Sequence, residues 1–257
     1  MIASLGMYDS GPARAANDRL WALARQELAH RGIEAPQGLT RGEGAYWPAW
    51  TAEDLVLSQT CGFPYRARLH GQVTLIGAPD HGLRDCPRGQ YRSVLVARKD
   101  DPRADFADFA TAPFAFNDDL SQSGWAAPAN WAAEQGFALT PRLRTGGHRA
   151  SAAAVAEGRA DLAALDAVTW AMMQEDGDPA VPGLKIVALT PPTPALPYIA
   201  GPGADGPAIF AALDAAIAAL SDEDRDTLHL RGLVALPAEA WLAVPIPAAP
   251  ADLGAAS

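Results

Sequence analysis

The sequence predicts an α/β protein in which short strands alternate with helices in doubly wound sheets. Short apolar runs recur between stretches whose apolar residues have helical spacing. The 22 prolines and 23 glycines are spread along the chain, as expected for turns between many short elements. A length of 257 residues suits one large or two small domains, and 49% apolar with 19% charged residues is an ordinary globular composition.

The individual elements follow from local patterns. A helix is expected between Pro12 and Gly32, with Ser10 as its N-cap, because Leu20, Trp21, Ala24 and Leu28 share one face. Further helices are expected over 125–135, 151–157, the stretch through Met172, and 208–220, with another starting at Ser221. Strands are predicted at 2–5, 55–57, 73–76, 91–97, 114–116, 161–165 and 185–189.

The proline-rich segment 191–197 indicates a crossing between two lobes. With a second crossing at 88–98, it predicts one lobe of residues 1–90 plus 192–257 and another of residues 91–191. The last dozen residues, rich in Ala and Pro, are expected to form a loose tail.

Charge and hydropathy exclude several classes of function. A formal net charge of −10 argues against nucleic-acid binding, which needs clustered Lys and Arg. No run approaches the roughly 18 apolar residues of a membrane span. No basic and apolar leader precedes the first strand, so a cytoplasmic location is expected for the chain as written, or a periplasmic one if a leader was removed. Cys61 and Cys86 are too few for a disulfide scaffold or a metal site, and thiols are expected.

Polar groups and glycines follow the predicted strands, where doubly wound sheets bind ligands. Hydroxyls and backbone N–H groups at helix N-termini are the parts of an anion site. The segments concerned are Ser58 to Gly62, Asn117 to Gly124, Thr145 to His148, and Asp166.

Three segments carry a resemblance to a known family. Ser121-Gln122-Ser123-Gly124-Trp125 with Pro128 resembles the Ser-x-Ser-Gly-aromatic-x-x-Pro signature of phosphate/phosphite/phosphonate ABC-transporter substrate-binding proteins. The strand beginning Tyr91-Arg92-Ser93-Val94-Leu95 is similar to that family's Tyr-x-Ser-Val-Leu strand. Gly147-His148, followed by an alanine-rich helix and Asp161, resembles a third family segment.

This resemblance implies a two-lobed, type II periplasmic-binding-protein-like fold with mixed sheets and two crossover strands. It implies that a small oxyanion (phosphate, phosphite, or an alkyl or aminoalkyl phosphonate) binds between the lobes, that an ABC permease is a further partner, and that the chain is a monomer. The implied ligand residues are Ser121, Gln122, Ser123, Gly124, Tyr91, His148, Asp166 and, in the first lobe, Gln59, Thr60, Tyr8 and either Tyr46 or Trp47. Gln122 departs from the family, which usually has a hydroxyl residue there.

Each of these residues has an alternative structural role. Ser121 and Ser123 could cap the following helix, and Asp166 could cap the next one. His148 could be a turn residue, and Tyr91 could belong to the core. A carboxylate at position 166 would repel an anion unless a proton or an amino group intervened, which a zwitterionic ligand would supply.

Binding without turnover is the expected activity, in transport or as a cytoplasmic sensor or carrier, with no cofactor and no metal. The alternative is an enzyme of the same fold acting on a small anionic metabolite. Cys61, His148 and Asp166 could form a nucleophile–base–orienter set in that case, although nothing in their local sequence supports it.

Overall fold

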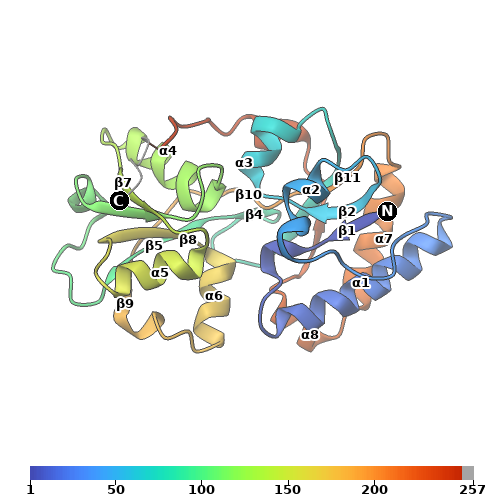
Figure 1. Ribbon diagram of the computed structural model, residues 1–257, viewed down its shortest axis with the longest axis horizontal. Helices are drawn as coiled ribbons and strands as arrows, with labels where there is room; N and C mark the ends of the chain where they lie inside the picture. Colours follow the sequence, from blue (N-terminus) through green and yellow to red (C-terminus); the bar gives the residue numbers. More distant parts are fainter. Residues whose placement is uncertain (251–257) are drawn as a thin grey trace. The chain divides into compact units, whose positions relative to one another are not determined.

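Residues 1–250 are described by the computed structural model of this chain, and they divide into two units (Figure 1). The first unit consists of Met1–Gln90 and Pro194–Ala243, and the second begins with Tyr91–Thr193. The segment 244–250 also belongs to the second unit, whereas the sequence placed it in the first lobe. Trp125 Nε1 donates to the carbonyl of Ala248, and Asn130 Nδ2 donates to that of Pro245. Residues 246–250 of the expected loose tail have no helix or strand, and one of these two bonds holds them at Ala248. The rest of that tail lies outside the described residues.

The first unit is a five-stranded sheet flanked by helices. Its elements are β1 (Ile2–Ser4), η1 (Gly6–Tyr8), α1 (Ala13–His30), η2 (Gly42–Ala45), α2 (Trp47–Trp50), β2 (Leu55–Gln59), α3 (Gly62–Pro64), η3 (Tyr65–Leu69), β3 (Thr74–Asp80), β11 (Tyr198–Ala200), α7 (Gly206–Ala219), α8 (Asp222–Thr227), β12 (Gly232–Val234) and α9 (Ala238–Leu242).

The strand order in this sheet is β1-β2-β11-β3-β12. Strand β1 is parallel to β2, and β11 is antiparallel to both β2 and β3, so β1, β2 and β3 end at the same edge. Helices α1 and α7 pack side by side through their apolar faces (Figure 1). Gly32 has φ +72°, the left-handed conformation predicted for the end of α1. At the start of α1, the backbone carbonyl of Ser10 accepts a hydrogen bond from the N–H of Ala13. The side chain of Ser10 does not cap the helix, so the expected N-cap was wrong.

The second unit is a second five-stranded sheet with helices on both faces. Its elements are β5 (Ser93–Arg98), η4 (Phe106–Phe109), β6 (Pro113–Phe116), η5 (Gln122–Ala126), α4 (Ala127–Glu134), β7 (Thr140–Arg144), α5 (His148–Ala156), β8 (Leu162–Asp166), α6 (Ala167–Glu175), η6 (Val181–Gly183) and β9 (Leu184–Leu189).

The order of strands in the second sheet is β7-β6-β8-β5-β9. Strands β6, β7 and β8 are parallel, and β5 runs antiparallel between β8 and β9. Alanine and valine are the commonest residues of the core around α5, which allows this helix to pack closely on the strands. Figure 1 shows α4 on one side of this sheet and α5 on the other. Because β5 is antiparallel to β8, Ser93 at its start pairs with Asp166 at the end of β8.

Two short strands connect the units. They are β4 (Gln90–Tyr91) and β10 (Thr193–Pro194), which pair with each other in a two-stranded sheet. The backbone N–H of Ala195 donates to the carbonyl of Gly89 over 2.9 Å, which extends this pairing into the first unit. Among the helices of residues 1–250, none has the length and apolar composition of a membrane span.

Asp101 anchors a buried ion-pair network in the second unit. Its side chain is 1% exposed and lies 2.6 Å from Arg103 Nη2, which is also 2.8 Å from Asp161. The guanidinium of Arg103 stacks over the Phe109 ring at 4.2 Å. The hydrogen bonds from Arg103 lower the pKa of Asp101 to about 2.

We expect Asp101→Asn to destabilise the protein by about 3 kcal/mol at pH 7, because it leaves Arg103 without its most buried partner. A carboxyl group with a lowered folded pKa contributes stability above its unfolded pKa of about 3.9 and loses it as the pH falls toward 2. In urea unfolding at several pH values, the gap between wild type and variant should close over that range. Asp100→Asn is the matched control, since that side chain is 90% exposed. A gap that stays constant with pH would contradict the assignment.

Candidate functional site

The carboxyl edge of the second sheet brings together most of the polar segments that the sequence singled out. Because β6, β7 and β8 are parallel, the segments after Phe116, Arg144 and Asp166 all leave the sheet at this edge. The backbone N–H of Thr145 donates to the carbonyl of Phe116, and that of Gly146 donates to the carbonyl of Asn117. The segments after β6 and β7 are therefore directly bonded.

Ser121 caps the helix that begins with η5 and continues into α4. Its Oγ accepts a hydrogen bond from the backbone N–H of Gly124 at 2.9 Å, and its backbone is extended. The structural alternative for Ser121, a helix cap, is therefore present. In this bond the Ser121 oxygen accepts, so the proton of the same hydroxyl group is still available for donation. Ser123 lies in the first turn, so its backbone N–H has no carbonyl partner within the helix. Both serines therefore lie at the N-terminus of the helix, which is the positive end of its dipole.

The side chain of Ser123 is joined to His148. Ser123 Oγ and His148 Nε2 are 3.0 Å apart, and Ser123 is 3% exposed. Burial lowers the pKa of His148 to about 4, and the carbonyl of Ala164 opposes this effect. The imidazole is therefore neutral at pH 7. Helix α5 begins at His148, three residues earlier than the sequence predicted, so the histidine lies in the first turn of a helix and not in a preceding loop.

Two further hydroxyl groups fix the backbone around this pair. Ser93 Oγ donates to the carbonyl of Ser123 at 2.8 Å. Thr145 Oγ1 lies 2.6 Å from Ser151 Oγ and also donates to the carbonyl of Gly147, which precedes α5. The positions of Ser123 and His148 are thus set by bonds to β5 and to the start of α5.

Gly124 is required by the packing at this turn. A Cβ atom at position 124 would lie 1.8 Å from Asn117 Oδ1 and 3.1 Å from Ser121 Oγ. Such contacts are far inside the van der Waals limit, so the side chain of Asn117 occupies the space that a larger residue would need. The glycine keeps the first turn of the helix close to the end of β6.

Asp166 is the N-cap of α6. Its Oδ1 accepts from the backbone N–H groups of Val168 at 2.8 Å and Thr169 at 3.0 Å, and the residue is 2% exposed. The capping alternative for this residue is therefore present in the structure. The register with Ser93 places the carboxyl group at the same sheet edge as the serines.

Tyr91 and Gln122 are the remaining candidates of the second unit. Tyr91 is 1% exposed on β4, as its core alternative requires. Gln122 is also buried, and its Nε2 donates to Oγ1 of Thr193 in the connecting strand β10 at 3.3 Å.

The candidates of the first unit lie near the corresponding edge of its own sheet. Gln59 ends β2, with Thr60 directly after it, and Tyr8 follows β1 in η1; all three are buried. Tyr46 donates its hydroxyl to the carbonyl of Gly6, and its side chain is 40% exposed. The ring of Trp47 packs against Trp50 and lies under Arg68, a packing role that sequence reasoning did not assign.

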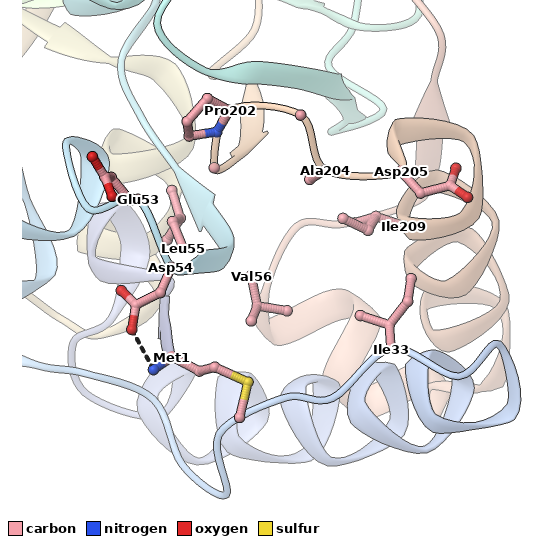
Figure 2. Close-up of a pocket in the computed structure, with 12 residues that line it drawn as sticks. Met1, Ile33, Glu53, Asp54, Leu55, Val56, Pro202, Ala204, Asp205 and Ile209 are labelled. Atoms are coloured by element: carbon pink, nitrogen blue, oxygen red, sulfur yellow. Dashed lines mark hydrogen bonds and ion pairs between the residues drawn. The ribbon is translucent and has the colours of Figure 1, made fainter.

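The pocket in Figure 2 lies at the opposite edge of the first sheet and differs in chemistry. It has a volume of about 300 Å³ and lies where β2 begins. Its wall is apolar, with Ile33, Val56 and Ile209, and carboxylates stand at its rim, including Asp54, which pairs with the amino group of Met1 (Figure 2). These carboxylates would repel an oxyanion.

The groups required for the enzyme alternative have other partners. His148 is bonded to Ser123, and Asp166 caps α6. Cys61 is buried in the first unit, Cys86 is partly exposed, and no disulfide joins the two. In residues 1–250 no group of three or more His, Cys, Asp or Glu side chains could hold a metal ion.

Sequence reasoning missed Ser93 as a part of this site, and it named Asn117 only as a member of the polar segment after the strand at 114–116. Ser93 became relevant only through the antiparallel register of β5 with β8, and the signal for Asn117 was its position directly after a predicted strand.

Comparison with protein families gives one match. The family described as ABC transporter, phosphonate, periplasmic substrate-binding protein matches residues 54–237, which is more than half of the chain. A comparison with curated proteins finds no match by sequence.

Solved structures share the fold at low sequence identity. PhnD1 from Prochlorococcus marinus, in complex with methylphosphonate, is 17% identical with a TM-score of 0.71, covering 93% of this chain and 94% of that one. A binding protein component of an ABC phosphonate transporter from Pseudomonas aeruginosa is 15% identical with a TM-score of 0.69, covering 95% and 83%. XAC2383 from Xanthomonas citri, bound to ATP, is 15% identical with a TM-score of 0.69, covering 95% and 97%. The fold is that of type II periplasmic-binding proteins, which confirms the fold class predicted from the sequence.

Proposed function

Because the chain belongs to the family of phosphonate ABC-transporter periplasmic substrate-binding proteins, we propose that it binds a small phosphorus oxyanion at the carboxyl edge of the second sheet. The ligand class is phosphate, phosphite, or an alkyl or aminoalkyl phosphonate. Ser121, Ser123, Gly124 and His148 are the proposed binding residues. The family match supports the ligand class, and the PhnD1 complex with methylphosphonate is a precedent within the same fold.

The observation that carries this proposal is the bonding of the two serines. The N–H of Gly124 donates to Ser121 Oγ. Ser123 Oγ and Nε2 of the neutral His148 are 3.0 Å apart, and we assign His148 the Nε2–H tautomer, in which this nitrogen donates to Ser123 Oγ. Each serine oxygen then accepts from the protein, which leaves each hydroxyl proton to donate to a ligand. Two hydroxyl donors and the N–H groups of a helix N-terminus suit the oxygens of a tetrahedral oxyanion.

The carboxyl group of Asp166 affects which charge and which organic group the ligand can carry. A buried carboxylate at the same sheet edge disfavours a fully ionised dianion. It favours a ligand that carries a proton or an amino group, such as a monoprotonated phosphonate or an aminoalkyl phosphonate. Tyr91 and Gln122 are proposed to complete the polar surroundings.

The proposed biological role is delivery of the bound oxyanion to an ABC permease in the periplasm, since the family is defined by that role. A cytoplasmic sensor or carrier is the alternative use of the same binding site. We propose binding without turnover, so a ligand incubated with the protein should be recovered unchanged by ³¹P NMR.

Ser123→Ala tests the site directly. Each charge-assisted hydrogen bond contributes about 1.5–3 kcal/mol, so methylphosphonate affinity should fall by roughly 10- to 150-fold in titration calorimetry. The variant should also lose about 1–3 kcal/mol of unfolding free energy, because the buried Nε2 of His148 loses its hydrogen-bond partner.

Ser221→Ala is the matched control. Ser221 caps α8 in the first unit, where its Oγ accepts from the N–H of Asp224. This variant should lose about 1 kcal/mol of stability and keep its affinity. Equal affinity of wild type and Ser123→Ala would show that the serines serve the helix alone, and the proposed site would then be wrong.

A further inference from the structure

The side chain of Asn117 lies over the first turn of the helix that Ser121 caps. A Cβ atom at Gly124 would be 1.8 Å from Asn117 Oδ1 and 3.1 Å from Ser121 Oγ, so the amide and the Ser121 hydroxyl border the same point. The backbone carbonyl of Asn117 accepts from the N–H of Gly146 at 3.0 Å, in the segment that leads to His148. The Asn117 side chain therefore lies in the part of the second unit that contains the proposed oxyanion site.

The amide group of Asn117 makes no hydrogen bond within the described fold. In residues 1–250, its Oδ1 is fully buried without a partner, and no group accepts a hydrogen bond from its Nδ2. The residue as a whole is partly exposed, so Nδ2 is the part of the amide that a ligand can reach. An amide nitrogen carries two N–H donors, and both are available here.

The orientation of this amide follows from its contact with Gly124. The inward atom lies against the Cα of Gly124, whose hydrogens make a weak hydrogen bond to an oxygen and would collide with those of an NH2 group. Rotation of the amide by half a turn would also bury N–H donors without an acceptor, and such donors are rarer in proteins than buried carbonyl oxygens without a donor. We therefore assign Oδ1 to the inward position and Nδ2 to the outward one.

The two carboxylates that follow Asn117 are both paired with one arginine. Arg144 Nη2 lies 2.5 Å from Asp118, and its Nη1 lies 3.3 Å from Asp119. Of the three consecutive polar residues 117–119, the uncharged one is thus the residue that packs on the N-terminus of the helix. An amide at this point can donate to an anion, whereas a carboxylate there would repel it.

We propose that Asn117 Nδ2 donates a hydrogen bond to an oxygen of the bound oxyanion, as a third side-chain donor beside Ser121 and Ser123. Because this donor acts at the same site, its role rests on the proposed function. Three side-chain donors match the three oxygens of a phosphonate or phosphite group. The lack of a side chain at Gly124 makes the room that the amide needs.

Two substitutions of Asn117 separate a ligand donor from a packing residue. Asn117→Ala removes the donor, so methylphosphonate affinity should fall by about tenfold in titration calorimetry. Asn117→Asp keeps the shape but places a carboxylate where the donor was, so affinity should fall by about 100-fold or more. A packing role would give the reverse order, because aspartate has nearly the volume of asparagine and alanine does not. The tenfold loss also limits the recovery of any variant that lacks this amide.

Asn130→Asp is the matched control and should keep wild-type affinity. It makes the same chemical change on α4, where Asn130 Nδ2 donates to the carbonyl of Pro245. Ser123→Ala, measured in parallel, separates this proposal from the proposed function. If it loses affinity while both Asn117 variants bind like wild type, or while Asn117→Ala binds more weakly than Asn117→Asp, then Asn117 is not a ligand donor and the oxyanion site stands. If none of these variants changes the affinity, or if wild type binds neither methylphosphonate nor phosphite, both proposals are wrong.

The wild-type protein decides the question if an Asn117 variant does not fold. The chain contains three asparagines, so selective ¹⁵N-asparagine labelling gives three side-chain NH2 signals, and resonance assignment identifies that of Asn117. Saturation with methylphosphonate should move this signal downfield, because its N–H gains an anionic acceptor. Bound ligand with an unchanged Asn117 signal would overturn the proposal.

Discussion

Gly124→Ala should lower methylphosphonate affinity by about 100-fold or more and reduce the free energy of unfolding by roughly 1–3 kcal/mol. The new methyl group would lie 1.8 Å from Asn117 Oδ1, so either the end of β6 or the first turn of the helix must move. It would also lie 3.1 Å from Ser121 Oγ, which the N–H of Gly124 now holds in place. The displacement therefore disturbs the cap and both proposed donor hydroxyls together. Titration calorimetry and urea unfolding measure the two effects.

Removal of the obstructing side chain provides the control. In the double variant Asn117→Ala/Gly124→Ala, the oxygen that the methyl group meets is absent, so much of the lost affinity should return. A Gly124→Ala protein that binds as tightly as wild type would show that this turn is not part of the ligand site.

The protein should lose stability as the pH falls from about 6.5 to 4. His81 and His148 are both buried, and burial lowers the pKa of each to about 4. A histidine with a pKa lower in the folded than in the unfolded chain binds protons preferentially when unfolded. Its contribution is complete above about pH 6.5 and declines toward pH 4. At about 1.36 kcal/mol per pKa unit, each histidine accounts for roughly 3 kcal/mol over this range.

Urea unfolding between pH 7 and pH 4 measures this loss, and His148→Gln should make the dependence shallower by about half. His30→Gln, at an exposed position, should leave it unchanged. The pH range in which the histidines change the stability is separate from that of Asp101, whose contribution to stability falls only below about pH 4. Titration of either buried histidine near pH 6.5 in NMR spectra would contradict the mechanism.

The parts of the fold that could be predicted from the sequence are those with strong local signals. The apolar run of β2 and the helix ended by Gly32 were found, because apolar periodicity and a left-handed glycine are local properties. Strand β7 was missed, since its sequence Thr-Pro-Arg-Leu-Arg is polar and pairs only with β6 at the sheet edge.

The sequence predicted many of the residues of the candidate site but not the hydrogen bonds between them. The residues after β6 and β8 were identified because strand ends in such sheets carry ligand groups. The bond from Ser123 to His148 depends on where α5 begins, and the bond from Ser93 depends on the direction of β5. Neither is a local property of the sequence.

The pairing of β4 with β10 has a consequence for how the protein can be divided. Residues 91–193 form one uninterrupted stretch that contains the whole second sheet, and the first unit lies on both sides of this stretch in the sequence. Gly89 and Ala195 are within backbone hydrogen-bonding distance, so the cut ends of the first unit are already neighbours. A linker of about two or three residues could close that gap, because a chain spans roughly 3.3–3.6 Å per residue. Residues 91–193 are thus topologically an insertion in a hairpin of the first unit, and excision at that hairpin would leave a continuous chain for the first sheet.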